Sequence, residues 1–113
     1  LHLMLGLGGK GEKQAEKYLV SQGYEIVERN FRCKFGEIDI IARKGGVLVF
    51  VEVKTRSGSG FGMGFESVTQ KKQEKLLLTA QAYMAGRPPT AARFDVVSID
   101  SGKITHIQNA FGA

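Results

Sequence analysis

Two apolar runs decide the fold of this chain: Glu37-Ile-Asp-Ile-Ile-Ala-Arg43 and Val47-Leu-Val-Phe-Val-Glu-Val-Lys-Thr55. Both are rich in β-branched residues and alternate with period 2, which is typical of β-strands. Gly45-Gly46 stands between them, and a Gly-Gly step between two such runs predicts a β-hairpin with a two-residue loop. The sequence therefore predicts an antiparallel pair of strands at the centre of the chain.

The register of this hairpin brings acidic groups together. If the two glycines form the loop, Asp39 faces Glu52 and Glu37 faces Lys54, all on one face of the sheet. Opposed carboxylates, with Cβ atoms roughly 4.5–5.5 Å apart, destabilise a sheet. A salt-bridge set pairing Glu37 with Lys54 on a solvated face is the plainer alternative, but it leaves the two facing acids unexplained. We therefore predict a divalent metal site at Asp39 and Glu52.

Length and composition restrict the class of protein. The chain has 113 residues, 42% hydrophobic and 24% charged, which indicates one globular domain over 11–113 behind a flexible N-terminal segment, 1–10. No stretch approaches the roughly 20 apolar residues of a membrane helix, so no membrane partner is expected. A net charge of +5 favours polyanionic partners, although many mildly basic domains bind no nucleic acid.

Cysteine and histidine are scarce. Cys33 is the only cysteine, which excludes an internal disulfide or a thiolate zinc site and predicts a reducing, cytoplasmic location. The only histidines, His2 and His106, are far apart in the sequence. Metal ligands would therefore be oxygens, which favour Mg²⁺ or Mn²⁺.

The remaining elements follow from periodicity and caps. We predict two helices, the second capped by Thr69, and three more strands: helices over 11–22 and 70–85, strands over 24–32, 94–100 and 103–107. The order α-β-β-β-α-β-β predicts an α/β fold with a mixed β-sheet flanked by helices. Four glycines within 57–64 predict either a mobile flap beside the site or a plain connector.

Longer motifs resemble a known family. Gly36-Glu37-Ile38-Asp39-Ile40-Ile41 followed by Val49-Phe50-Val51-Glu52-Val53-Lys54-Thr55-Arg56 is similar to the signature of the bacterial YraN family. The similarity extends over most of the chain, through Gly11-Glu12, Ala15, Tyr18-Leu19, Gly23-Tyr24, Arg29-Asn30, Ser67-Val68-Thr69, Lys72 and Arg93-Phe94-Asp95-Val96-Val97. That family is placed in the PD-(D/E)xK nuclease-like superfamily, together with the archaeal Holliday-junction resolvases.

The resemblance implies a restriction-endonuclease-like core and a set of site residues. In that superfamily the matching positions, Asp39, Glu52 and Lys54, carry metal binding and catalysis, and the carbonyl of Val53 is a further ligand. A glutamate of the first helix often completes such a site, and Glu12 fits this position. The alternative for Glu12 is an acid favoured by the helix macrodipole.

Several residues around the site are assigned less sharply. Glu37 would hold the ammonium group of Lys54. Arg56, Lys72 and Lys71 would contact the DNA backbone, which gives salt-dependent binding without sequence readout. For the two lysines, a solvated helix face is the alternative.

Two functions of different classes follow. The first is a Mg²⁺- or Mn²⁺-dependent nuclease that hydrolyses DNA, structured or branched DNA above all. The second is a DNA-binding or scaffolding protein that keeps the nuclease fold without cleaving. A protein-interaction module with an exposed edge strand is a third, weaker alternative. Symmetric cutting of a four-way junction would require a homodimer.

Overall fold

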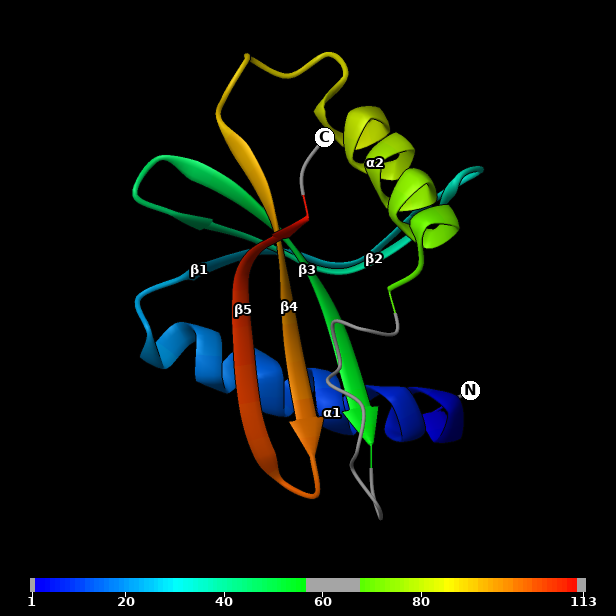
Figure 1. The fold of residues 1–113 in the computed structure, drawn as a ribbon, viewed down its shortest axis with the longest axis vertical. Coiled ribbons are helices and arrows are strands. Elements are labelled where there is room, and N and C mark those ends of the chain that lie inside the picture. The colour runs from blue at the N-terminus through cyan, green and yellow to red at the C-terminus, as the bar shows by residue number, and fades with distance from the viewer. Residues whose placement is uncertain (1, 57–67, 112–113) are drawn as a thin grey trace.

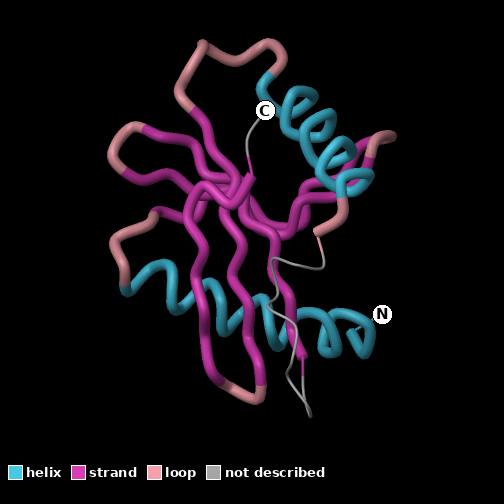
Figure 2. The backbone as a smooth tube through the Cα atoms, in the orientation of Figure 1, coloured by secondary structure: helices cyan, strands magenta, loops and turns pink. Residues whose placement is uncertain are grey.

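The fold is a five-stranded sheet with two helices, seen in a computed structural model that describes residues 2–56 and 68–111 (Figures 1 and 2). Side chains are described for 11–55 and 68–111. The elements in chain order are α1 (His2–Ser21), β1 (Glu25–Cys33), β2 (Gly36–Lys44), β3 (Val47–Arg56), α2 (Gln70–Met84), β4 (Ala92–Asp100) and β5 (Lys103–Phe111). This confirms the predicted order α-β-β-β-α-β-β. The predicted flap at 57–64 lies outside the described residues.

The strands lie side by side in chain order, β1-β2-β3-β4-β5. All neighbouring pairs are antiparallel except β3 and β4, which are parallel. A parallel pair needs a long crossover connection, and α2 supplies it between these two strands. The sheet is therefore mixed, as the sequence predicts.

The hairpin register agrees with the prediction. Lys44 pairs with Val47, and the paired positions run back as far as Ile40, which faces Val51. Both loop glycines adopt positive φ, at +57° for Gly45 and +80° for Gly46. Such angles are strained for residues with a Cβ, which is why a two-residue loop of this kind favours glycine.

Element boundaries differ most at the two ends of the chain. Helix α1 begins at His2, not at the predicted Gly11. Whether residues 1–10 are flexible stays a prediction. Strand β5 continues to Phe111, past the predicted end at Ile107. Helix α2 agrees closely, with Thr69 as the N-cap accepting a hydrogen bond from the Lys72 backbone N–H. Within the described residues, neither helix is long and apolar enough to cross a bilayer.

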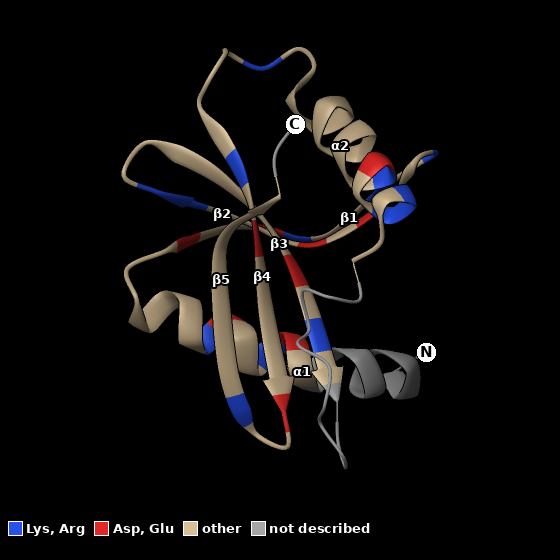
Figure 3. Ribbon diagram, viewed as in Figure 1, with Lys and Arg blue, Asp and Glu red and all other residues tan. Residues whose placement is uncertain are grey.

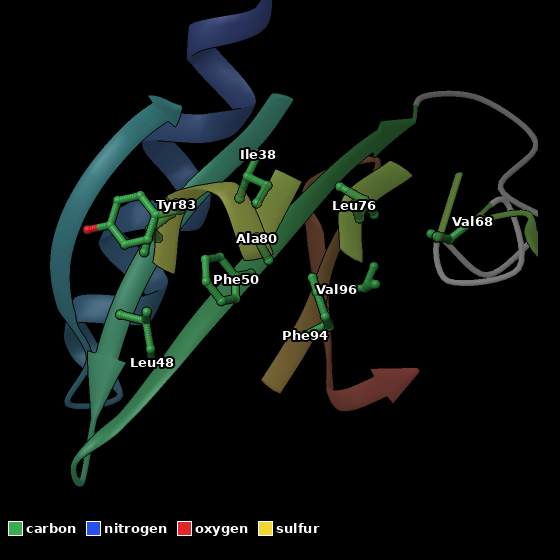
Figure 4. Close-up of a cluster of buried hydrophobic side chains, with 10 residues drawn as sticks. Ile38, Leu48, Phe50, Val68, Leu76, Ala80, Tyr83, Phe94 and Val96 are labelled. Atoms are coloured by element: carbon green, nitrogen blue, oxygen red, sulfur yellow. The ribbon is translucent and has the colours of Figure 1, made fainter. Parts of the chain in front are cut away.

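The core consists of two layers, one on each face of the sheet. Helix α2 contributes Leu76, Ala80 and Tyr83 to one layer, where they pack against strand residues such as Phe50 (Figure 4). Helix α1 contributes the fully buried Ala15 and Leu19 to the other. Neighbouring residues of β4, Val96 and Val97, belong to opposite layers, as period-2 alternation requires. The remaining strand residues of the two layers are Ile38, Ile41, Leu48, Phe94 and, on the α1 side, Ile40, Ala42, Val49, Val51 and Ile99.

A polar network joins β4 and β5 inside this frame. Asp95 is fully buried, and its carboxylate lies 2.8 Å from His106 Nε2 and 3.0 Å from Arg93 Nε. It also accepts a hydrogen bond from the Asn109 backbone N–H at 3.0 Å, where the pairing of β4 with β5 shifts register. The Tyr18 hydroxyl lies 3.0 Å from the second ring nitrogen of His106 and so ties α1 to the network. A buried charge that is satisfied in this way stabilises the fold.

Candidate functional site

The site lies where β2 and β3 stop pairing. Ile40 is the last residue of β2 that is paired with β3, opposite Val51. One residue beyond it, Asp39 Oδ2 accepts a hydrogen bond from the Val53 backbone N–H at 2.8 Å. Ile38 and Ile40 pack in opposite core layers, so the period-2 alternation breaks at Asp39 itself. The irregularity places one carboxyl group between two strands that no longer bond to each other.

Asp39 is an unusual aspartate because its charge is poorly stabilised. Burial and the neighbouring negative charge of Glu52 raise the pKa of Asp39 from 3.8 to about 7. The hydrogen bond from Val53 opposes this shift, and the charges of Glu12 and Glu37 add to it. The expected proximity of Asp39 and Glu52 is thus visible as an electrostatic interaction between the two carboxyl groups.

Glu52 receives two lysines on one oxygen. Its side chain is only 8% exposed, and its Oε2 lies 2.7 Å from Lys72 Nζ and 3.4 Å from Lys54 Nζ. Lys54 comes from the same strand, two residues along, whereas Lys72 reaches over from the first turn of α2. Two cations therefore share a single carboxylate oxygen.

The pKa values of Lys54 and Lys72 shift in opposite directions. Burial and the neighbouring positive charge of Lys72 lower the pKa of Lys54 below its usual range, although Glu52 acts to raise it. Burial also acts to lower the pKa of Lys72, but its hydrogen bond with Glu52 raises the pKa overall. The pKa of the Lys54 amine is thus lowered while that of Lys72 is raised.

A pocket of about 500 Å³ opens in front of these groups. Figure 3 shows basic residues (blue) at the N-terminal end of α2 and acidic residues (red) on the strands that it covers. A Cβ atom placed on Gly36 would lie 3.2 Å from Thr79 Oγ1, so β2 and α2 approach closely at one end of the pocket. The lining residues are Gly36, Glu37, Asp39, Glu52, Thr69, Lys71, Lys72, Lys75, Leu76 and Thr79.

Glu37 does not pair with Lys54 as predicted. Its Oε2 lies 3.3 Å from Arg32 Nε, across the β1–β2 pair, while Lys54 turns to Glu52. The physical reason is that β2 and β3 have separated before this position, so the cross-strand neighbour of Glu37 is no longer on β3. Glu37 nevertheless lines the pocket.

Glu12 lies near the acidic residues from the α1 side. With its amide oriented to suit its neighbours, Asn30 donates to Glu12 Oε1 at 3.1 Å and to Glu37 Oε2 at 3.2 Å. Burial raises the pKa of Glu12, the Asn30 bond opposes this, and the charges of Glu37 and Glu52 raise it further. Asn30 itself has a positive φ of 52°, which asparagine tolerates better than most residues.

The carboxylate oxygens of Asp39 and Glu52 suit a hard divalent cation that needs only few ligands from the protein. Among the side chains that the structure describes, no three acidic, histidine or cysteine residues lie at metal-ligand spacing. Asp39 and Glu52 are thus two carboxylates without a third, and Mg²⁺ is commonly held by one or two carboxylates while water and phosphate complete its shell. Burial is the main cause of the raised pKa of Asp39, and the charge of Glu52, which such a cation would offset, adds to it. The assignments of Glu12 and the Val53 carbonyl as ligands stay predictions.

Two kinds of residue were missed from the sequence. Lys75 lines the pocket with Lys71 and Lys72, and its helical spacing from both was a signal that could have found it. Asn30 bridges Glu12 and Glu37, and its place in the family-like Arg29-Asn30 motif was the signal that could have found it. The Arg56 side chain, predicted to bind DNA, lies outside the described side chains.

Comparison with known proteins identifies the family of this chain. The model of the family described as Uncharacterised protein family UPF0102 matches residues 11–99. A UPF0102 protein of Persephonella marina is 47% identical over 106 residues, covering 92% of this chain and 91% of the relative. Others come from Hahella chejuensis, 52% identical over 82% of this chain and 77% of the relative, and Symbiobacterium thermophilum, 47% identical over 95% and 97%. The resemblance to the YraN family is confirmed: this chain belongs to the UPF0102 (YraN) family.

Proposed function

We propose that this protein is a metal-dependent nuclease that hydrolyses DNA phosphodiester bonds. The observation that carries the proposal is the pairing of a poorly stabilised Asp39 with the buried Glu52, with Lys54 Nζ 3.4 Å from Glu52. A fold without a charged ligand at this point would gain stability by replacing one of the two carboxylates, since like charges at close range repel. Membership of a family resembling the PD-(D/E)xK nucleases supports the same reading.

Each residue has a part in this proposal. Asp39, Glu52 and the Val53 carbonyl would hold Mg²⁺ or Mn²⁺, which supplies a Lewis acid for the phosphoryl oxygen and lowers the pKa of a bound water. Lys54 orients the attacking water and takes up its proton, which its lowered pKa favours.

The substrate follows from the charge around the pocket. Lys71, Lys72 and Lys75 line it from the α2 side, and the chain carries a net charge of +5. Lysines contact phosphates as point charges and carry no base readout, so we propose that the protein binds the DNA backbone and selects by shape. Branched DNA and a homodimer that cuts it symmetrically belong to the same proposal, as does action in the cytoplasm.

A second function has one observation in its favour. Both lysines sit on Glu52, and among the described side chains no third acid lies at ligand spacing. This arrangement also suits a DNA-binding or scaffolding protein in which Lys54 and Lys72 neutralise the charge of a former metal site. Such a protein would bind branched DNA and leave it intact.

The deciding experiment offers labelled linear, flapped and four-way DNA to the protein in Mg²⁺ or Mn²⁺, with EDTA as a blank. Asp39→Asn and Glu52→Gln remove the two carboxylate charges, and Glu25→Gln removes an exposed acid of β1 as the matched control. We expect cleavage by the wild type and by Glu25→Gln, and none by the two site variants or in EDTA.

The outcomes separate the candidates. Cleavage that persists in Asp39→Asn would indicate a contaminating nuclease. Wild-type protein that binds four-way DNA without cutting it under any divalent cation would refute the nuclease and favour the scaffolding protein.

A further inference from the structure

Glu52 is already occupied by a cation of the protein's own. Lys72 Nζ lies 2.7 Å from Glu52 Oε2, closer than Lys54 at 3.4 Å. A nitrogen–oxygen distance of 2.7 Å is at the short end for a charge-assisted hydrogen bond. An ion that binds through Glu52 must therefore compete with this ammonium group.

The two lysines differ in how freely they can leave. Lys54 projects from the middle of the sheet and its side chain is 21% exposed, whereas that of Lys72 is 41% exposed. Lys72 also stands on the first turn of α2, just after the Thr69 cap, where its long side chain reaches Glu52 across the pocket. Of the two, the more exposed Lys72 side chain is the one that swings away from Glu52 more easily.

We infer that Lys72 is a built-in competitor for the metal: it holds Glu52 in the metal-free protein and moves to the substrate phosphate when a divalent cation binds. This rests on the proposed function, because it assumes that the cation binds at Asp39 and Glu52. Lys72 is thereby a positioning residue whose partner changes during the cycle.

Charge balance gives the exchange a direction. Without a polyanion, a displaced Lys72 stays in a pocket that Lys71 and Lys75 also line. With Asp39 and Glu52 taken up by the cation, Glu37 is the remaining carboxylate of that lining, and the three ammonium groups outnumber it and repel one another. A phosphodiester in the pocket supplies the missing anion. Cation and DNA therefore each favour the binding of the other, and linkage requires the effect to be reciprocal.

The test measures Mn²⁺ alone, by electron paramagnetic resonance of the free ion, in wild type, Lys72→Met, Lys71→Met and Lys72→Arg. Lys71→Met is the matched control, since it removes one ammonium from the same pocket but none that contacts Glu52. We expect Lys72→Met to bind Mn²⁺ roughly tenfold more tightly than wild type, the worth of about one charge-assisted hydrogen bond. Lys71→Met should change the affinity far less, and Lys72→Arg should stay near wild type.

A second readout follows DNA. The affinity for a labelled duplex, measured by fluorescence anisotropy, should rise on adding Ca²⁺ in wild type. This gain should shrink more in Lys72→Met than in Lys71→Met, which removes a neighbouring ammonium group but leaves the contact with Glu52 in place. Ca²⁺ is used here to fill the site while limiting cleavage.

The results distinguish this inference from the proposed function. If Lys72→Met binds Mn²⁺ no better than Lys71→Met, the competitor role is wrong and the metal site stands. If no variant binds Mn²⁺, both the competitor role and the metal site are refuted. If Lys72→Met tightens Mn²⁺ binding while no DNA is ever cut, the competitor role holds and the nuclease fails.

Discussion

The sheet contains two aspartates that each take a backbone N–H where strand pairing is irregular, yet they meet opposite surroundings. Asp95 Oδ1 accepts from Asn109 at the register shift between β4 and β5. Asp39 Oδ2 accepts from Val53 where β2 leaves β3. Burial acts to raise the pKa of Asp95, but hydrogen bonds from His106 and Arg93 lower it overall. The pKa of Asp39 rises to about 7 instead.

The difference lies in the neighbours supplied to each carboxylate. Asp95 is surrounded by donors, whereas the nearby charge that acts most strongly on Asp39 is another carboxylate, Glu52. A buried acid with a full set of donors holds a fold together. A buried acid facing a second acid keeps negative charge available for something that the chain itself does not provide. The same residue type is thus held by donors at Asp95 and belongs to the proposed metal site at Asp39.

Removing Asp95 should have the largest effect. Asp95→Ala removes the fully buried acceptor of His106 and of the partly exposed Arg93, and breaking a buried ion pair costs about 3–5 kcal/mol. Urea denaturation should show this as a lower midpoint with an unchanged slope. Asp39→Asn, measured alongside, should be close to wild type or more stable, because it removes a repulsion and keeps an oxygen for the Val53 N–H. Equal losses of stability in both variants would contradict the difference proposed between the two aspartates.

Asp39→Asn tests the other side of the comparison. This variant keeps an oxygen for the Val53 N–H but removes the charge, so the fold should persist. Residues that only support a metal ligand contribute up to roughly 100-fold to metal affinity, so the loss of a ligand should weaken Mn²⁺ binding at least roughly 100-fold. Isothermal titration calorimetry with Mn²⁺ gives the affinity, and circular dichroism checks the fold. Unchanged Mn²⁺ affinity in a folded variant would place the metal elsewhere.

Stability should depend on pH in opposite ways for the two residues. The pKa of Asp39 is 3.8 unfolded and about 7 folded, so the folded state binds more protons in between and stability falls as pH rises from about 4 to about 7. The folded-state pKa of Asp95 is lowered, so its stabilisation is present above its unfolded pKa and is lost as pH falls through the folded one. Thermal melts in metal-free buffer should lose the first slope in Asp39→Asn only. A wild-type melting temperature that is flat between pH 4 and 7 would contradict this.

The smallest effect is expected at an exposed ion pair. Arg29 and Glu16 form a salt bridge between β1 and α1, with the Arg29 side chain 59% exposed. Pairs of this kind contribute about 0.2–1 kcal/mol. Arg29→Gln should therefore shift the urea midpoint only slightly, and less so at high salt. A loss as large as that of Asp95→Ala would mean that burial is not what separates strong from weak charge pairs here.

Local signals predicted most of the fold. The Gly45-Gly46 loop determines the hairpin register, and the Thr69 cap determines where α2 begins. The contact of Lys72 with Glu52 was out of reach, because it depends on how α2 packs across the sheet. Glu37 was assigned the wrong partner, because the separation of β2 from β3 at Asp39 depends on how the strands pack and not on a local sequence pattern. The Asp95 network escaped for the same reason: it requires the far end of β5, which the sequence marks only weakly.

Gly36 determines how near the lysine-bearing helix stands to the acids. An added methyl group there would lie 3.2 Å from the Thr79 hydroxyl of α2, tighter than ordinary contact, and the φ of +155° at Gly36 is strained for a residue with a Cβ. Either the Thr79 side chain or helix α2 would have to give by a few tenths of an ångström, and a shift of the helix would carry Lys72 with it. The missing side chain of Gly36 therefore allows α2, and with it the Lys72 amine, to lie this close to the acids of the pocket. A crystal structure of Gly36→Ala would measure the adjustment directly.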